Sequence, residues 1–300
     1  MSATKPTVGW IGLGKIGTPM AQQVQAAGYP LVVYNRTAGK LKPLVEAGAK
    51  AAGGMTELAA QSDVVISMIS DDPALREVGA AVKAGIKKGA LYIDMSTVSP
   101  AASAEVAGWI NGAGASYLRA PVSGSTMLAS KGALTIFVSG PKPVFEAHRP
   151  IFEAMGKAIH HVGPAEEARH LKLAINLMIG VTAATIGEAL AFGEGGGMEW
   201  RQMIDIINAS VVASPLTGYK AEMLKNRDFA PAFTAAQMVK DFDLALETAR
   251  AANVPMPVTA MVRQFMGALV AMGRGEKDFF SYVTLMEDLA GLSARAKPKD

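Results

Sequence analysis

The 300-residue chain contains no cysteine, which excludes a disulfide framework, a thiolate metal site and a cysteine nucleophile. Histidine is scarce, and its four copies are His148, His160, His161 and His170. Because no two of them form an HxxxH or HExxH pair, we expect no metal site. Charged residues make up only 18% of the chain, which excludes a disordered polypeptide kept in solution by its charges.

The chain also has little excess of charge of either sign. The net charge is +3, from 29 basic and 26 acidic residues, and the segment 294–300 supplies +2 of it through three basic residues and one acidic residue. The pI of about 9.0 therefore does not indicate a nucleic-acid surface, which would gather Lys and Arg on one face. No uninterrupted apolar run reaches the roughly 18 to 20 residues of a membrane span, and the N-terminus has no signal-peptide pattern. We expect a cytoplasmic protein with no nucleic-acid and no membrane partner.

Half of the residues are hydrophobic, and the length suits one large domain or two medium ones. In residues 1–164, short apolar runs alternate with longer helix-period stretches, the pattern of a mainly parallel α/β sheet. The predicted strands are Val8–Ile11, Leu31–Tyr34, Val64–Met68, Leu91–Asp94, Ser116–Leu118, Leu134–Val138 and Ala158–Val162. Predicted helices between them include Lys15–Ala27 and Pro100–Asn111, the latter with Ser99 as its N-cap.

The pattern changes after Gly163-Pro164, and residues 165–293 predict an all-helical domain, followed by the basic tail 294–300. A helix of roughly seven turns is predicted from Glu166 to about Phe192, which would join the two domains. Further helices are predicted at Trp200–Asn208, Ala235–Ala252, Val258–Met272 and Phe279–Leu289.

A glycine-rich turn follows the first predicted strand and opens the first predicted helix. It consists of Gly12, Leu13, Gly14, Lys15, Ile16 and Gly17, a G-x-G-x-x-G sequence. Glycine removes the Cβ atoms that would keep a pyrophosphate from the backbone amides, and the helix N-terminus offers unpaired N–H donors. In this strand–turn–helix context the motif predicts binding of a dinucleotide cofactor.

The end of the second predicted strand carries the signal for cofactor choice. An NAD-selective site places Asp or Glu there to bind the ribose 2′-hydroxyl, but this chain has Asn35, Arg36 and Thr37. A guanidinium makes a planar, charge-assisted contact with a 2′-phosphate, and the two neighbours add neutral hydrogen-bonding groups. We therefore expect NADP rather than NAD, with NAD possible.

Four ordered motifs resemble those of the β-hydroxyacid dehydrogenases, a family that includes 3-hydroxyisobutyrate dehydrogenase. The resemblance covers almost the whole chain, and the motifs are the segment 8–21 (VGWIGLGKIGTPMA), the segment 120–124 (APVSG), Lys172 with Asn176, and the segment 240–245 (KDFDLA). It implies a Rossmann domain, a long helix between domains, a helical domain similar to the C-terminal part of 6-phosphogluconate dehydrogenase, and a homodimer or homotetramer.

The resemblance also implies roles for residues beyond the glycine-rich turn. Met68, Ile69 and Ser70 match residues along the middle of the cofactor, and Thr97 matches a residue at its nicotinamide end. Ser123 and Gly124 match the residues that bind the substrate carboxylate, and Lys240 matches a lysine that reaches both cofactor and substrate. We expect Asp243, three residues after Lys240, to orient it.

Lys172 and Asn176 carry the predicted chemistry. They are four residues apart on the long helix and so share one face. Oxidation of an alcohol requires loss of the hydroxyl proton, which an amine accepts when burial or a nearby cation lowers its pKa from about 10.4. Lys172 resembles the family's catalytic lysine, and Asn176 would align it with the substrate hydroxyl. The predicted reaction interconverts a small 3-hydroxy acid and its semialdehyde.

Two departures from the family pattern lie near this predicted site. Arg119 stands where the family usually has an acid, and Ser125 stands where it has glycine. In the approach to the long helix, similar to GxxGxGxxxK, only Gly163 is kept, and Glu166 and Ala168 replace the later glycines. Arg119 either adds a cation for an anionic substrate or pairs within the fold.

Other functions remain open on the same scaffold. A catalytically silent dinucleotide-binding module is one, although such modules commonly lose the lysine that this chain keeps. An imine reductase is another, but those relatives usually carry Asp or Tyr in place of Lys172. A 6-phosphogluconate dehydrogenase shares the fold, but its helical part is much longer.

Overall fold

The computed structural model describes residues 5–292, and the chain divides into two compact units, Met1–Lys172 and Leu173–Asp300. They are called the first and the second unit here. The basic tail predicted at 294–300 lies outside the described residues.

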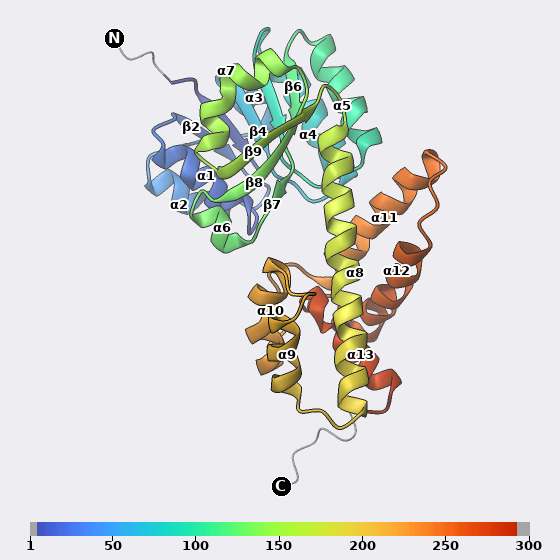
Figure 1. Ribbon diagram of the computed structural model, residues 1–300. Coiled ribbons are helices and arrows are strands. Elements are labelled where there is room, and N and C mark those ends of the chain that lie inside the picture. Colours follow the sequence, from blue (N-terminus) through green and yellow to red (C-terminus); the bar gives the residue numbers. More distant parts are fainter. Residues whose placement is uncertain (1–4, 293–300) are drawn as a thin grey trace. The chain divides into compact units, whose positions relative to one another are not determined.

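The first unit is built on one nine-stranded sheet (Figure 1). Its order is β3-β2-β1-β4-β5-β6-β8-β7, with β9 paired to β8. All neighbours are parallel except β6 with β8 and β7 with β8, which are antiparallel. The strands are β1 Val8–Ile11, β2 Leu31–Tyr34, β3 Lys50–Ala51, β4 Val64–Ser67, β5 Leu91–Asp94, β6 Ser116–Arg119, β7 Val122–Ser123, β8 Leu134–Ser139 and β9 Gly156–Gly163.

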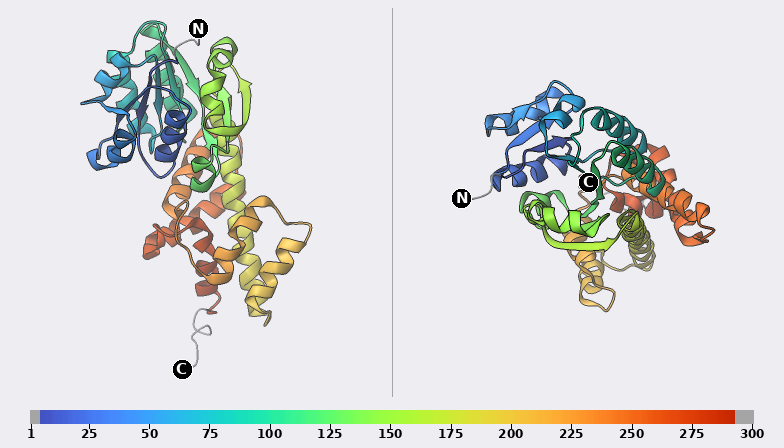
Figure 2. Two further views of the ribbon diagram at one scale, coloured as in Figure 1. Left: turned by 90° about the vertical axis from the view of Figure 1, so that its left-hand side faces the viewer. Right: turned by 90° about the horizontal axis from the view of Figure 1, so that it is seen from above.

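Helices cover both faces of this sheet (Figure 2). They are α1 Gly17–Ala26, α2 Lys42–Glu46, α3 Met55–Gln61, α4 Asp72–Gly85, α5 Pro100–Gly112, α6 Thr126–Ser130 and α7 Lys142–Glu153, with a 3₁₀ turn, η1, at Ala38–Leu41. Ser99 caps α5 as predicted, because its side chain accepts a hydrogen bond from the amide of Ala102. The mainly parallel Rossmann architecture expected from the sequence is therefore confirmed.

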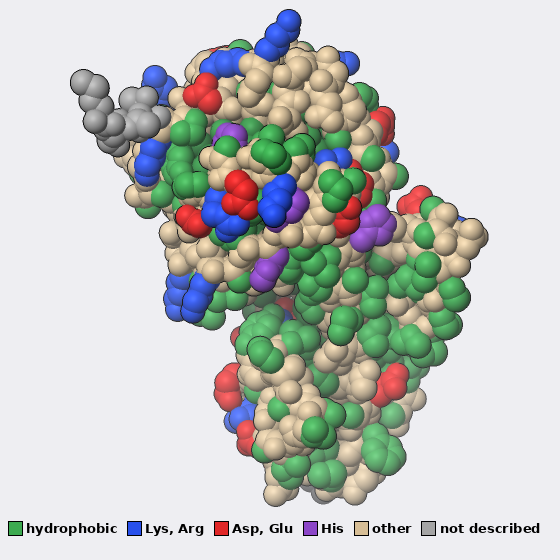
Figure 3. Space-filling view, turned by 45° about the horizontal axis from the view of Figure 1, so that its top comes forward, with side chains coloured by type: hydrophobic (Ala, Val, Ile, Leu, Met, Phe, Trp, Pro, Cys, Tyr) green, Lys and Arg blue, Asp and Glu red, His purple; other side chains and the backbone are tan. Residues whose placement is uncertain are grey.

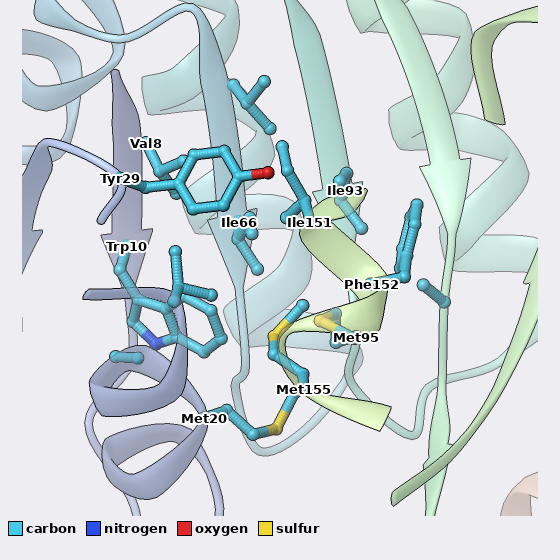
Figure 4. Close-up of a cluster of buried hydrophobic side chains, with 14 of the residues drawn as sticks. Val8, Trp10, Met20, Tyr29, Ile66, Ile93, Met95, Ile151, Phe152 and Met155 are labelled. Carbon is cyan, nitrogen blue, oxygen red and sulfur yellow. The ribbon is translucent and has the colours of Figure 1, made fainter. Parts of the chain in front are cut away.

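Each face of the sheet has its own hydrophobic core because side chains alternate along a strand. Trp10 of β1 and Ile66 of β4 belong to one core, and Ile11 and Val65 belong to the other. Figure 4 shows Trp10 and Met20 in the first of these cores, beside the start of α1. The indole nitrogen of Trp10 also donates to the carbonyl of Gly12 at 3.1 Å. The core thus supports the turn that follows β1.

The second unit is helical, as predicted. Its elements are most of α8 Glu167–Gly195, then α9 Trp200–Ala209, α10 Pro215–Asn226, α11 Ala235–Ala251, α12 Pro257–Leu269, a π-helical turn η2 Val270–Arg274, a 3₁₀ turn η3 Phe279–Ser281 and α13 Tyr282–Leu289. By length and composition alone α8 could cross a membrane. However, Ala183, Ala184 and Leu190 of α8 are buried in the core of the second unit with residues of α9, α11 and α13. A central core helix of this kind passes the same test of length and composition.

All seven predicted strands are present, with ends that differ by no more than two residues. The two missed strands, β3 and β7, have only two residues each, too short to show a period. The sequence pattern predicts no helix at α10, because a Ser-Pro pair such as Ser214-Pro215 is also typical of the breaks between helices. In the structure Ser214 is the N-cap and Pro215 the first helical residue, and Thr217 completes a capping box.

Candidate functional site

The carboxyl ends of β1, β4 and β5 bring together the turns that the sequence predicted to hold a dinucleotide. The strand order reverses between β1 and β4, and ligands of open parallel sheets bind outside the strand ends at such a point. Backbone hydrogen bonds fix these turns to neighbouring strands. The amide of Gly12 donates to Tyr34, that of Met68 to Ile11, and that of Met95 to Ser67, at 2.9 to 3.2 Å.

The three glycines of the first turn differ in what surrounds them. A Cβ on Gly12, which has φ +98°, would overlap the carbonyl oxygen of Met68, and a Cβ on Gly17 would overlap that of Gly12. These two glycines are therefore required by the packing of the turn itself. At Gly14 a Cβ would meet nothing within 4 Å. Moreover, Ile16 at the N-cap of α1 makes no side-chain cap hydrogen bond. The turn has the open surface and the uncapped helix start that a pyrophosphate requires.

Of the residues after β2, Asn35 is hydrogen-bonded within the fold and Arg36 is exposed. Asn35 accepts a hydrogen bond from the amide of Leu13 at 2.9 Å and donates to the carbonyl of Thr37 at 3.0 Å. It therefore ties the glycine-rich turn to the end of β2, a role that its predicted contact with the ribose did not include. Arg36 is exposed and makes no ion pair or hydrogen bond within residues 5–292. Its guanidinium is available to a ligand phosphate.

The turns after β4 and β5 are joined through a serine. Ile69, in the predicted Met68–Ser70 segment, donates its amide hydrogen to Ser96 Oγ at 2.9 Å. Ser96 in turn donates to the buried carboxylate of Asp94 at 2.8 Å. Because Thr97 follows Ser96 directly, these two predicted cofactor segments share one support.

The predicted carboxylate-binding residues lie at the end of β7. Ser123 is half-buried, and Gly124 is exposed with φ +141°, a conformation that disfavours a side chain. A Cβ on Gly124 would also lie 2.7 Å from the side chain of Leu134. Ser125, the departure from the family pattern, is the N-cap of α6 and accepts from the amide of Leu128 at 3.4 Å. Its side chain stabilises the helix start.

Two other departures from the family pattern pair with each other. Arg119, at the end of β6, donates through Nε to Glu166 Oε1 at 2.8 Å, and its Nη2 contacts the same oxygen. Both side chains are largely buried. Glu166 stands in place of a glycine just before α8. Of the two roles considered for Arg119, a cation for the substrate or a partner within the fold, the structure shows the second. It pairs within the fold, and the two replacements compensate each other's charge.

The predicted residues of the second unit meet at Asp241, which is 2% exposed. Asn176 on α8 donates through Nδ2 to Asp241 Oδ2 at 2.5 Å, and Lys240 Nζ lies 3.0 Å from Asp241 Oδ1. The prediction that Asp243 orients Lys240 is wrong. Asp243 points to α12, where Arg263 donates to both of its oxygens at 2.7 and 2.8 Å.

Sequence reasoning missed Asp241, although it directly follows Lys240 in the KDFDLA segment. On a helix, side chains three or four residues apart are expected to meet, which pointed to Asp243. In the structure the Lys240 amine instead contacts the carboxylate of the adjacent residue, Asp241. The predicted acid/base Lys172 is 9% exposed and lies one turn before Asn176 on α8. The hydrogen bond to Asp241 holds Asn176 in place on this helix.

A second buried arginine lies in the first turn of α8. Burial is the largest single influence on Arg169 and lowers its pKa, but the charge of Asp94, together with Tyr117 and Glu166, raises it by more, so the pKa of Arg169 is raised overall. Burial also raises the pKa of Tyr117, next to this pair, to about 12. Arg169 therefore stays charged and Tyr117 stays protonated over the pH range of an ordinary assay. Among residues 5–292 no three His, Asp or Glu side chains gather as metal ligands. On the face of the first unit that Figure 3 shows, positive and negative side chains are mixed.

Comparison with known proteins covers nearly the whole chain. Residues 7–163 match the model of the NAD-binding domain of 6-phosphogluconate dehydrogenase, and residues 167–286 match that of the NAD-binding domain of NADP-dependent 3-hydroxyisobutyrate dehydrogenase. The chain is 33% identical to 2-(hydroxymethyl)glutarate dehydrogenase of Eubacterium barkeri over 95% of this chain and 96% of the relative. It is 32% identical to NAD-dependent L-serine dehydrogenase of Pseudomonas aeruginosa, over 95% and 99%.

Among solved structures, the 3-hydroxyisobutyrate dehydrogenase of Mycobacterium tuberculosis with L-serine superposes with a TM-score of 0.86. It is 26% identical, and the match covers 93% of this chain and 98% of that one. The architecture agrees with the resemblance noted in the sequence.

Proposed function

The chain belongs to the β-hydroxyacid dehydrogenase family and is an NAD(P)-dependent oxidoreductase, and from that premise we propose a specific reaction for it. The reaction is the interconversion of a small 3-hydroxy acid and its semialdehyde, with Lys172 as general acid/base. The observation that carries the proposal is the pairing of Asn176 with the buried Asp241 at 2.5 Å, one helical turn from Lys172.

Each residue has a distinct task in the proposed reaction. A bound nicotinamide supplies the hydride acceptor or donor. In the oxidation direction Lys172 Nζ accepts the hydroxyl proton of the substrate, and in the reduction direction it returns that proton to the carbonyl oxygen. Asn176 is fixed by Asp241 and presents its amide oxygen to the lysine or the substrate hydroxyl. Ser123 Oγ and the amide of Gly124 donate to the substrate carboxylate.

We propose that the cofactor is NADP in preference to NAD. The glycine-rich turn and the open space at Gly14 suit either dinucleotide. The preference is supported by Arg36, which is exposed beyond β2 without an ion pair in residues 5–292, and by the lack of an acid at 35–37. A 2′-phosphate there would gain a charge-assisted contact, whereas a 2′-hydroxyl would find no carboxylate.

The test is a fluorescence titration with NADPH and NADH, followed by assays with short 3-hydroxy acids and semialdehydes. Tighter binding of NADPH and turnover of one of the panel are expected. Tighter binding of NADH would contradict the cofactor preference. Binding without turnover of any panel member would contradict the proposed reaction and favour a silent dinucleotide-binding module, and turnover of cyclic imines alone would favour an imine reductase.

We also propose that the protein is a cytoplasmic homo-oligomer that uses its second unit as the interface. Among residues 5–292, sixteen large hydrophobic side chains are exposed, and thirteen of them belong to the second unit, including Phe192 at 87% and Val211 at 101% exposure. The visible face of that unit carries few charges (Figure 3). Large uncharged apolar surfaces mark sites of association. Light scattering is expected to give the mass of a dimer or tetramer, and a mass near 31.2 kDa would contradict the proposal.

A further inference from the structure

A closed set of polar contacts surrounds Arg169, the third residue of α8, which is 1% exposed. Its Nη2 donates to Asp94 Oδ2 at 2.5 Å, and its Nη1 donates to the carbonyl of Ser96 at 2.6 Å. The Nε donates to Ser103 Oγ at 3.2 Å, and Nη2 also reaches the Tyr117 hydroxyl at 3.3 Å. All three nitrogens of the guanidinium are therefore engaged by β5, β6, α5 and the turn after β5. All of these residues lie in the first unit.

The acceptor of this arginine also supports the two turns predicted to hold the cofactor. Asp94 Oδ1 accepts hydrogen bonds from Ser67 at 2.6 Å and from Ser96 at 2.8 Å. The amide of Ile69 then donates to Ser96 Oγ at 2.9 Å. A single carboxylate thus connects the end of β4, the turn after β4, the turn before Thr97 and the first turn of α8.

This cluster is not explained by stability alone. Both side chains of the Arg169–Asp94 pair are fully buried, and well-packed apolar residues of similar volume stabilise a fold as well as such a pair or better. Unlike apolar packing, a planar guanidinium with several directional hydrogen bonds fixes the orientation of the segment that carries it. The first turn of α8 is therefore held at one position on the sheet.

Lys172 follows Arg169 by three residues on the same rigid helix, about 4.5 Å along its axis. A displacement of the helix start is therefore transmitted directly to the lysine. An error of about 1 Å in the position of a reacting group lowers a rate by roughly 10²-fold.

We propose that Arg169 is a positioning residue, which fixes the Lys172 amine relative to the cofactor turns by anchoring the first turn of α8 on Asp94 and Ser96. The inference rests on the proposed function, in which Lys172 is the acid/base. It adds a residue that touches neither substrate nor cofactor and acts only through the position of the helix.

The experiment is a double-variant cycle with Arg169→Lys, Lys172→Ala and the two combined. A lysine at 169 keeps the charge opposite Asp94 but has a single nitrogen, which cannot engage Ser96, Ser103 and Tyr117 together. We expect Arg169→Lys to lower kcat about tenfold and to change the Kd for NADPH less than threefold. In the Lys172→Ala background the same change is expected to have no further effect on the residual rate, because there is no amine to misplace.

Each outcome separates the two claims. A further tenfold loss in the combined variant would overturn the positioning role and leave the proposed function standing. A wild-type kcat for Arg169→Lys would also overturn it. If Lys172→Ala itself kept its activity, the proposed function would fail first, and the positioning role with it.

A matched control is a second fully buried ion pair within the described part of the chain, Lys220 with Asp278 at 2.7 Å in the second unit. Replacing Lys220 by Met and Arg169 by Met each leaves a buried carboxylate without its partner and destabilises the fold. Both variants are expected to melt at lower temperature, but only Arg169→Met lowers kcat of the remaining folded protein. An equal loss of kcat in both variants would assign the effect to stability. If the Arg169→Met chain does not fold, the double-variant cycle with Arg169→Lys still tests the positioning role.

Discussion

Replacing Gly14 by Ala separates cofactor binding from folding. The structure leaves at least 4 Å of open space where the new Cβ would lie, and the φ of Gly14 is outside the left-handed region. The substitution therefore costs the fold nothing, and it is expected to raise the free energy of unfolding by about 0.4–1 kcal/mol by restricting the unfolded chain. A pyrophosphate on the glycine-rich turn would occupy this same space.

The loss of cofactor affinity follows from the hydrogen bonds involved. A hydrogen bond between a backbone amide and a charged oxygen contributes about 1.5–3 kcal/mol, and a methyl group at Gly14 would push the phosphates away from at least one amide. We expect the Kd for NADPH to rise about 10- to 100-fold. The assay is a fluorescence titration with NADPH, together with a thermal melt of the apoprotein.

Gly108, in the exposed middle of α5, is the matched control, since its Cβ would also meet nothing within 4 Å. Gly108→Ala is expected to stabilise the fold by up to about 1 kcal/mol and to leave the Kd unchanged. An unchanged Kd for Gly14→Ala would refute the placement of the pyrophosphate. A lowered melting temperature for Gly14→Ala would show that this glycine, like Gly12, serves the fold.

Three further predictions concern other parts of the chain. Arg36→Ala is expected to weaken NADPH binding about tenfold or more and NADH binding less than twofold, and equal losses in parallel titrations would remove Arg36 as the selector. Asp241→Asn is expected to lower kcat/KM for the hydroxy acid about tenfold, because Asn176 loses a charged acceptor; an unchanged kcat/KM would show that this pair is structural only. Burial raises the pKa of Glu287 above 4.5, so its contribution to stability is complete below pH 4.5 and is lost as the pH rises through the raised pKa. The melting temperature of Glu287→Gln relative to the wild type is therefore expected to rise between pH 4.5 and 8, and a difference independent of pH would contradict this.

The strands and most helices were predictable because their signals are local. Apolar runs bounded by Gly, Asp or Pro defined the seven longer strands, and Ser99-Pro100 marked the start of α5. The turn of Gly12 to Gly17 was recognisable because its position between strand and helix is also local. The Ser214-Pro215 pair shows the limit of such signals, since the same two residues can end one helix or begin the next.

The buried polar contacts were not predictable, because they join residues far apart in the sequence. Arg169 and Asp94 are 75 residues apart, and Asn176 and Asp241 are 65 apart. A single sequence gives no reason to match these partners. In the sequence Glu166 is a lost glycine and the start of the long helix. Its pairing with Arg119 depends on the end of β6 lying beside the start of α8, which the sequence does not show.

The most direct test of the proposed chemistry is the effect of Lys172→Ala on kcat and on the Kd for NADPH, measured on the same preparation with a substrate found in the panel. The lysine is proposed to act on the substrate proton and to make no contribution to dinucleotide binding. We predict that kcat falls by orders of magnitude while the Kd changes less than about threefold. A kcat that stays within threefold of the wild type, or a parallel loss of kcat and NADPH affinity, would contradict the assignment of Lys172 as the general acid/base.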